Sequence, residues 1–257
     1  MRKLATPISH LFYEDKSVYE DIIKYSDCLE GRDRTHNLSF PEEEIFHSDY
    51  QPIHELSDSL WKYFEKVAKS KPYIKMVSFH VASSCDQPIL NGRMWEEGGR
   101  VYTVEEMKEN AKSNFKRLRT IFPDGVRFAI ENNNYYPTKA YEHVCEAEFI
   151  SDLAKENDLY FLFDIAHSMV SAKNMKVDWK DYIGKLPLER MIQVHICTPG
   201  DDSGLAFDAH EYPSEQILEV VKDLLKYPSL EYFTVEYYKD KDKLIDSLKQ
   251  VRSIIND

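Results

Sequence analysis

Short apolar runs alternate with amphipathic stretches along this chain, and the alternation is regular from residue 72 onward. Such alternation is typical of βα units, in which each strand of a parallel sheet is followed by a helix packed against it. Strand-like runs rich in β-forming residues end at His80, Glu131, Asp164, His195 and Glu236. Each run leads into a segment typical of a loop.

The stretches between these runs carry apolar residues at helical spacing. Helices are expected at residues 103–121, 146–156, 214–225 and 240–255. The first opens with Thr103 followed three positions later by Glu106, the pattern of a capping box. Helices and strands therefore alternate over the last two thirds of the chain.

The first third is less regular. Strands are expected at residues 4–9 and 35–40, and helices at 17–29 and 57–69. With the five later runs this makes seven strands, and an eighth, short and irregular, is expected around residues 28–32. The chain of 257 residues suits one large core and is short for two. We therefore predict an α/β fold, a single (β/α)8 TIM barrel spanning residues 1–257.

Composition and charge narrow the class of protein. Hydrophobic residues make up 42% of the chain, and no apolar run approaches the roughly 20 residues that cross a bilayer. The first ten residues lack the apolar segment of a signal peptide, so we expect a soluble cytoplasmic protein. The four cysteines are scattered and are expected to be free thiols. A net charge of −12 argues against a broad nucleic-acid surface.

The candidate functional residues lie at the ends of the predicted strands. In a parallel barrel the last residues of the strands point to a common centre at the C-terminal face. Two short motifs add to the five strand-end residues: Asp164-x-x-His167, and Asp208-x-His210 in the loop after His195. The segment 87–99 is expected to be a long functional loop. With His36 from the predicted strand 35–40, the candidate metal ligands are His36, His80, Glu131, Asp164, His167, His195, Asp208, His210 and Glu236.

This number of ligands suits several ions. One divalent ion takes about three or four protein ligands, so the set fits two or three ions with a carboxylate such as Glu131 as a bridge. The set contains nitrogen and oxygen donors without a thiolate, which is compatible with iron, manganese or zinc. His47 or His54 could stand in for His36. Glu131, Glu236 and His167 are in addition the candidate catalytic residues.

Several blocks resemble the multinuclear non-haem iron-dependent oxidases, within the xylose-isomerase-like and endonuclease IV-like barrels. The resemblance covers about residues 76–257 and is carried by the segments 129–132, 145–149 and 171–195. It continues through Phe207-Asp208-Ala209-His210 and Val235-Glu236-Tyr237.

The resemblance implies an enzyme that holds two or three irons and uses O2 to modify a ribosomally made peptide, usually at cysteine. It further implies a central iron on Glu131, Asp164, His195 and Glu236, with His36 and His80 joining Glu131 at one flank. His167, Asp208 and His210 would bind at the other flank. A partner protein that captures the leader peptide of the substrate is a further implication.

Two other functions remain open from the sequence. A sugar isomerase or epimerase would use Glu131 and Glu236 as acid and base around one metal, although one metal leaves the Asp208-x-His210 pair without a role. A phosphodiesterase or abasic-site endonuclease would use three zinc ions to generate hydroxide. A barrel that lacks catalytic activity and serves as a binding module is disfavoured, because every candidate metal ligand at the strand ends is present.

Overall fold

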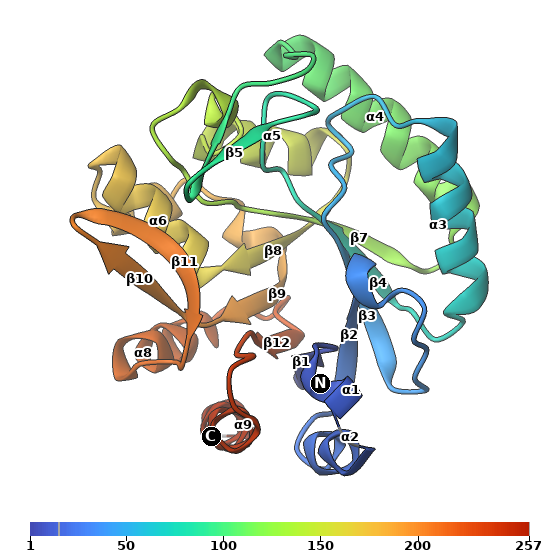
Figure 1. Cartoon of the computed structure of the whole chain (residues 1–257), viewed down its shortest axis with the longest axis vertical. Helices are drawn as coiled ribbons and strands as arrows, with labels where there is room; N and C mark the ends of the chain where they lie inside the picture. Colours follow the sequence, from blue (N-terminus) through green and yellow to red (C-terminus); the bar gives the residue numbers. More distant parts are fainter. Residues whose placement is uncertain (15, 257) are drawn as a thin grey trace.

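A computed structural model describes residues 1–14 and 16–256, and in this part of the chain eight parallel strands close into a barrel (Figure 1). Their order around the barrel is β1, β12, β9, β8, β7, β4, β3, β2, so the first and last strands pair and close the sheet. The strands are β1 (Lys3–Pro7), β2 (Cys28–Arg32), β3 (Glu43–Ser48), β4 (Met76–Phe79), β7 (Arg127–Glu131), β8 (Tyr160–Asp164), β9 (Met191–Ile196) and β12 (Tyr232–Val235). The predicted TIM barrel is confirmed.

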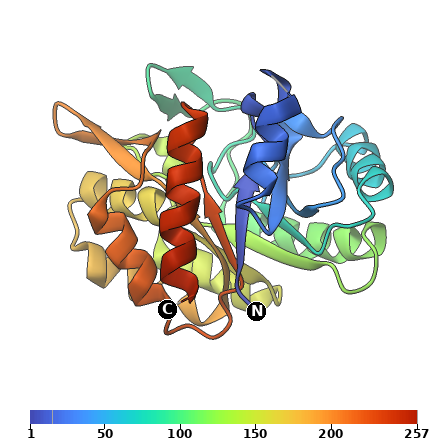
Figure 2. The same ribbon diagram turned by 90° about the horizontal axis from the view of Figure 1, so that it is seen from below.

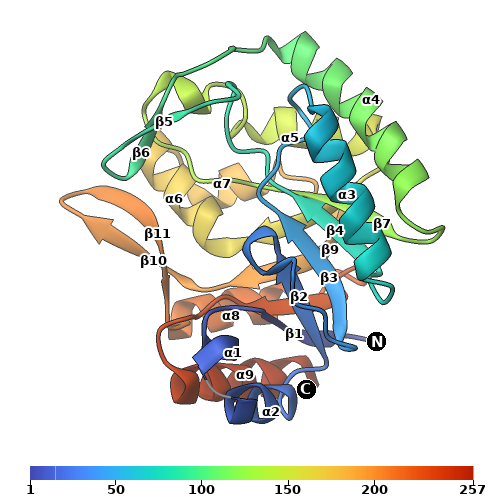
Figure 3. The ribbon, with the colours of Figure 1, turned by 45° about the vertical axis from the view of Figure 1, so that its right-hand side comes forward.

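Helices surround the barrel, as Figures 1 and 3 show. They are α1 (Leu11–Glu14), α2 (Lys16–Ile23), α3 (Asp58–Ser70), α4 (Val104–Ile121), α5 (Ala147–Glu156), α6 (Ile165–Met175), α7 (Trp179–Ile183), α8 (Glu215–Leu224) and α9 (Lys241–Asn256). Short 3₁₀ turns lie at Asp33–Thr35, Lys139–Tyr141 and Leu188–Arg190. Among the described residues, no helix combines the length and the apolar character needed to cross a membrane.

The barrel interior contains a layer of side chains to which each strand contributes one residue. The layer consists of Ala5, Cys28, Ile45, Met76, Ala129, Leu162, Ile192 and Tyr232, all buried. Because side chains alternate along a strand, the residue two positions further on points inward one layer higher. Ile45 is thus followed by His47, Ala129 by Glu131 and Leu162 by Asp164, so the apolar layer supports a polar one directly above it.

The prediction of a strand at residues 35–40 is wrong. Residues Asp33–Thr35 form a 3₁₀ turn, and the strand is β3, further along the chain. The sequence of β3 opens with two charged residues, Glu43 and Glu44, which is not typical of a buried strand. The Glu43 carboxylate is buried, and Lys71 Nζ lies 2.6 Å from its Oε1. The irregular eighth strand expected around residues 28–32 is β2.

Most predicted helices are present, with shifted ends. The helix expected at 17–29 ends at Ile23, because the chain enters β2 at Cys28. The helix α6 was not predicted, since the Asp164-x-x-His167 motif was interpreted only as a ligand pair. Asp164 also caps this helix, and its Oδ1 accepts a hydrogen bond from His167 N at 2.6 Å.

Two hairpins rise above the C-terminal ends of the strands. The first, β5 (Ile89–Asn91) with β6 (Met94–Glu96), lies in the segment 87–99 that was expected to be a loop. The second, β10 (Thr198–Asp202) with β11 (Leu205–Glu211), follows β9 and carries Asp208 and His210. Figure 2 shows both hairpins at the end of the molecule opposite the two chain termini.

Candidate metal centre

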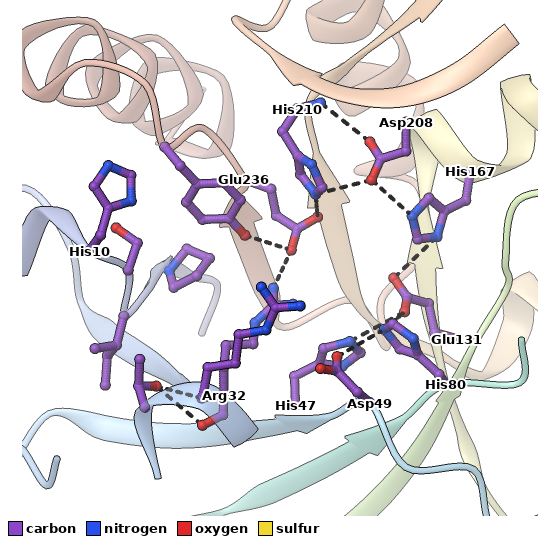
Figure 4. A pocket seen from close by; sticks show the side chains of 16 residues that line it. His10, Arg32, His47, Asp49, His80, Glu131, His167, Asp208, His210 and Glu236 are labelled. Carbon is purple, nitrogen blue, oxygen red and sulfur yellow. Dashed lines mark hydrogen bonds and ion pairs between the residues drawn. The ribbon is translucent and has the colours of Figure 1, made fainter. Parts of the chain in front are cut away.

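A pocket of about 500 Å³ opens at the C-terminal ends of the strands. Its lining includes the acidic and imidazole side chains His47, Asp49, His80, Glu131, His167, Asp208, His210 and Glu236. These side chains come from strands, loops and one helix that are far apart in the sequence, and they point toward one another (Figure 4). The convergence expected for parallel strand ends is therefore present.

Glu131, at the end of β7, lies between two groups of histidines. Its Oε1 is 3.2 Å from His195 Nδ1 and 3.5 Å from His167 Nδ1. Its Oε2 is 3.1 Å from His80 Nε2 and 3.4 Å from His47 Nε2. Each carboxylate oxygen thus faces a different group, which is the arrangement that a bridging carboxylate requires.

His47 occupies the position that the sequence analysis gave to His36. It lies on β3, and Ser78 Oγ is 2.8 Å from its Nδ1, so its Nε2 is turned toward Glu131. Ligand atoms of His47, His80 and Glu131 all lie within 4.8 Å of one another. Asp49 Oδ1, which is 4.0 Å from His80 Nε2, borders the same group.

The structure does not bring His36 to the cluster. His36 follows the 3₁₀ turn before β3, and its Nδ1 is 2.7 Å from the carbonyl oxygen of Asp33. Its ring packs edge-on against Tyr63, with 5.3 Å between the ring centroids. His54, the other substitute considered, stacks on Tyr102 and also lies outside the pocket lining. The assignment of His36 must therefore be corrected to His47.

A central group forms where β8, β9 and β12 end. His195 Nδ1 lies 3.7 Å from Asp164 Oδ2 and 3.3 Å from Glu236 Oε2, in addition to its contact with Glu131. All these residues are at most 2% exposed. Buried carboxylates at such distances repel one another unless cations or protons lie between them.

Four buried atoms of the cluster lack a hydrogen-bond partner within the described residues: His47 Nε2, Glu131 Oε1, Asp164 Oδ2 and His195 Nδ1. Buried polar atoms are normally paired, so a convergent set of unpaired acceptors needs an explanation. A divalent cation supplies one, because imidazole nitrogen and carboxylate oxygen are its usual protein ligands. The donor set therefore fits bound metal.

Two residues of β2 that the sequence analysis missed hold the central ligands in place. Glu30 Oε2 accepts a hydrogen bond from His195 Nε2 at 3.1 Å, which leaves Nδ1 free to face the centre. Arg32 pairs with Oε1 of Glu236, and Tyr238 donates to the same oxygen at 3.1 Å. The alternation of Glu30 and Arg32 along a short strand was the signal that could have identified them.

The second flank is built by α6 and the β10–β11 hairpin. Asp208 Oδ2 lies 3.5 Å from His167 Nε2 and 3.1 Å from His210 Nε2, and His210 Nε2 is 3.6 Å from Glu236 Oε2. His167 Nδ1 donates to the carbonyl of Asn132 at 2.9 Å, which turns Nε2 toward Asp208. His210 has a φ of 44°, a left-handed conformation that is uncommon outside glycine.

The close packing of acids and imidazoles shifts their pKa values. Burial, with the Glu131 and Glu236 carboxylates adding to it, raises the pKa of Asp164 to about 7. Burial by itself favours a higher pKa for Glu131 and Glu236. Neighbouring cationic groups outweigh this effect of burial and hold both pKa values well below the usual range. Burial lowers the pKa of His80 to about 4. A bound cation would replace the protons that this cluster otherwise shares.

Similar structures have the same barrel. The IOLI protein with a binding zinc atom aligns with a TM-score of 0.67 and 13% identity, covering 99% of this chain and 98% of that one. A D-tagatose 3-epimerase-like protein aligns with a TM-score of 0.60 and 19% identity, covering 99% and 98%. At these identities the likeness concerns the fold, which is that of the xylose-isomerase-like barrels.

Sequence relatives indicate the family. A UPF0276 protein of Acaryochloris marina is 33% identical over 134 residues, which are 52% of this chain and 48% of that protein. The chain thus spans about half the length of that curated relative. The family model described as RiPP precursor modification enzyme MbnB/TglH/ChrH matches residues 56–255, and this match includes every candidate ligand except His36 and His47. The chain belongs to this family of TIM-barrel enzymes.

Proposed function

We propose that this protein is an iron-dependent oxidase that uses O2 to modify a ribosomally made peptide at cysteine. The observation that carries the proposal is the set of buried ligand atoms around Glu131, at the mouth of the barrel, that have no hydrogen-bond partner within the described residues. Membership of the RiPP precursor modification family supports a peptide as the substrate. The nitrogen and oxygen donors of the cluster suit iron.

The residues would hold iron in three adjoining positions. Glu131, Asp164, His195 and Glu236 form the central one, His47 and His80 with Glu131 form one flank, and His167, Asp208 and His210 form the other. When bound, iron supplies a Lewis acid for a substrate thiolate and a one-electron reductant for O2. Four of these side chains, those of His47, His167, His195 and Glu236, are oriented by the contacts described above.

The protein residues have distinct tasks in this reaction. Glu131 would serve the central group and one flank together, since its Oε1 faces His195 and its Oε2 faces His80. Arg32 and Tyr238 hold Oε1 of Glu236, so that only Oε2 faces the centre. The pocket of about 500 Å³ is large enough for one residue of an extended peptide with parts of its neighbours. We propose that a partner protein capturing the leader segment delivers that peptide.

The test begins with anaerobic purification, iron analysis and O2 consumption with a cysteine-containing peptide. We expect iron-dependent O2 uptake and a mass change in the peptide. His47→Ala should lose both iron and activity, whereas His36→Ala, the matched control outside the cluster, should keep them. Protein that holds only zinc and is inert toward O2 with every thiol peptide would contradict the proposal.

The same preparation separates the alternatives. Conversion of a ketose without O2 would point to an isomerase or epimerase, and cleavage of an abasic duplex would point to a zinc hydrolase. Either result in place of O2 uptake would replace the proposed function.

A further inference from the structure

Cys197 lies at the central group of ligands, although the sequence analysis gave it no role. It follows β9 two positions after His195, so the alternation that turns His195 inward turns Cys197 inward as well. Its side chain is fully buried. Ligand atoms of Asp164, Cys197 and Glu236 all lie within 4.8 Å of one another, and Sγ is 3.9 Å from Asp208 Oδ1.

We propose that Cys197 Sγ coordinates, as a thiolate, the ion that Asp164 and Glu236 hold. Metal–oxygen bonds of about 2.0–2.2 Å and metal–sulfur bonds of about 2.3 Å place two ligands of one ion at most roughly 4.5 Å apart. The three side chains need only small rotations to meet that limit. The inference rests on the proposed function solely for the presence of an ion in the centre.

A second observation points to a ligand at the same place. Asp164 Oδ2 is buried and has no hydrogen-bond partner within the described residues, and it belongs to the side chain that shares the group with Cys197. The remaining contact of the thiol, with Asp208 Oδ1 at 3.9 Å, is long for a hydrogen bond and does not account for the placement of Sγ.

Coordination by Cys197 would change the chemistry of the centre. Its proton would be released to solvent as the metal–sulfur bond forms. A thiolate is a soft ligand that favours zinc, cobalt or iron over magnesium and manganese. The central ion would then have a mixed nitrogen, oxygen and sulfur environment rather than the nitrogen and oxygen set expected from the sequence.

The experiment uses Co²⁺ alone as the probe, added to metal-free protein without any peptide or thiol. Sulfur bound to Co²⁺ gives a near-ultraviolet charge-transfer band, whereas the visible d–d bands report cobalt with any ligands. We expect both kinds of band in the wild type and in Cys145→Ala, a matched control for a buried thiol away from the site. Cys197→Ala and Cys197→Ser should keep the d–d bands and lose the charge-transfer band.

The possible results distinguish the role of Cys197 from the proposed function. Cobalt d–d bands without the charge-transfer band in the wild type, or a charge-transfer band that survives in Cys197→Ala, would overturn the role of Cys197 and leave the proposed function intact. Failure of every variant to bind cobalt would remove the metal centre itself. X-ray absorption of the cobalt protein gives a second readout, with a sulfur neighbour expected at about 2.3 Å only where Cys197 is present.

Discussion

The guanidinium of Arg93 lies over the ring of Phe207, with its central carbon 3.8 Å from the ring centroid. Arg93 belongs to the turn of the β5–β6 hairpin and Phe207 to β11, directly before Asp208. The end of the ring lies close to Gly200, because a Cβ added there would approach Phe207 Cζ to 2.5 Å. Phe207 therefore links its own hairpin to the β5–β6 hairpin, and this contact helps to hold the strand that carries Asp208 and His210.

Removal of this contact should loosen the second flank. Arg93→Ala loses a cation–π interaction of about 0.5–1 kcal/mol, so metal affinity at the His167, Asp208 and His210 position should fall by roughly two- to fivefold. Metal titration followed by mass spectrometry or calorimetry measures this affinity. Arg117→Ala removes a similar contact with Trp61, 4.2 Å from its ring centroid on the outer helices, and should leave metal binding unchanged. Equal losses in both variants would contradict the role of Arg93.

Glu30 should act on the metal through His195. Replacement by glutamine keeps the size of the side chain and removes the carboxylate that accepts from His195 Nε2. Loss of such a supporting carboxylate weakens metal binding by about 10- to 100-fold. The control is Glu44→Gln, a β3 carboxylate that pairs with Lys3 and Lys75. Unchanged affinity in Glu30→Gln, measured by competition with a chelator, would show that Glu30 serves stability alone.

A buried ion pair outside the site should matter for stability. Lys71 Nζ lies 2.6 and 2.9 Å from the two carboxylate oxygens of Glu43, and both side chains are 1% exposed. Lys71→Met leaves the buried Glu43 carboxylate without its cation and should lower the free energy of unfolding by about 3–5 kcal/mol. Lys75→Met, which breaks an exposed pair with Glu44, should lower it by less than about 1 kcal/mol. Urea denaturation at neutral pH measures both, and similar losses would refute the distinction.

His54 should make stability depend on pH. Burial lowers its pKa in the folded protein below the ordinary value of 6.5, although the carbonyl oxygen of Ser83 accepts a hydrogen bond from its Nε2 at 2.8 Å. Below pH 6.5 the unfolded chain takes up a proton that folded His54 resists, so stability falls as the pH decreases through this value, by at most about 1.4 kcal/mol per pH unit. At higher pH both states are neutral and this contribution is complete.

The matched comparison isolates that group. The free energy of unfolding is measured at pH 7.5 and 5.5 for the wild type, His54→Gln and His143→Gln, where His143 is an exposed imidazole. The histidines of the candidate metal centre are the same in all three proteins, so their contribution cancels in the comparison. We expect the smaller decrease only in His54→Gln, and an identical decrease in all three would reject the assignment.

The sequence predicted most of the barrel because its later strands are apolar and end in ligand-type residues. It failed at β3, where Glu43 and Lys71 neutralise each other inside the protein, since a linear pattern cannot reveal a partner 28 residues away. That failure carried over to His36, which was selected from the wrong strand, whereas His47 lies on the correct one. Cys197 could have been identified by extending the inward alternation of β9 beyond His195.

The pairing of β1 with β12 has a consequence for biosynthesis. The central group of ligands includes Glu236, which directly follows β12. This strand closes the sheet by pairing with β1 and β9. A nascent chain that has emerged only as far as β9 would expose Asp164 and His195 without the carboxylate that completes their shell. Metal binding by this group should therefore be a late event that follows ring closure, so that no ion is held in an incomplete coordination sphere.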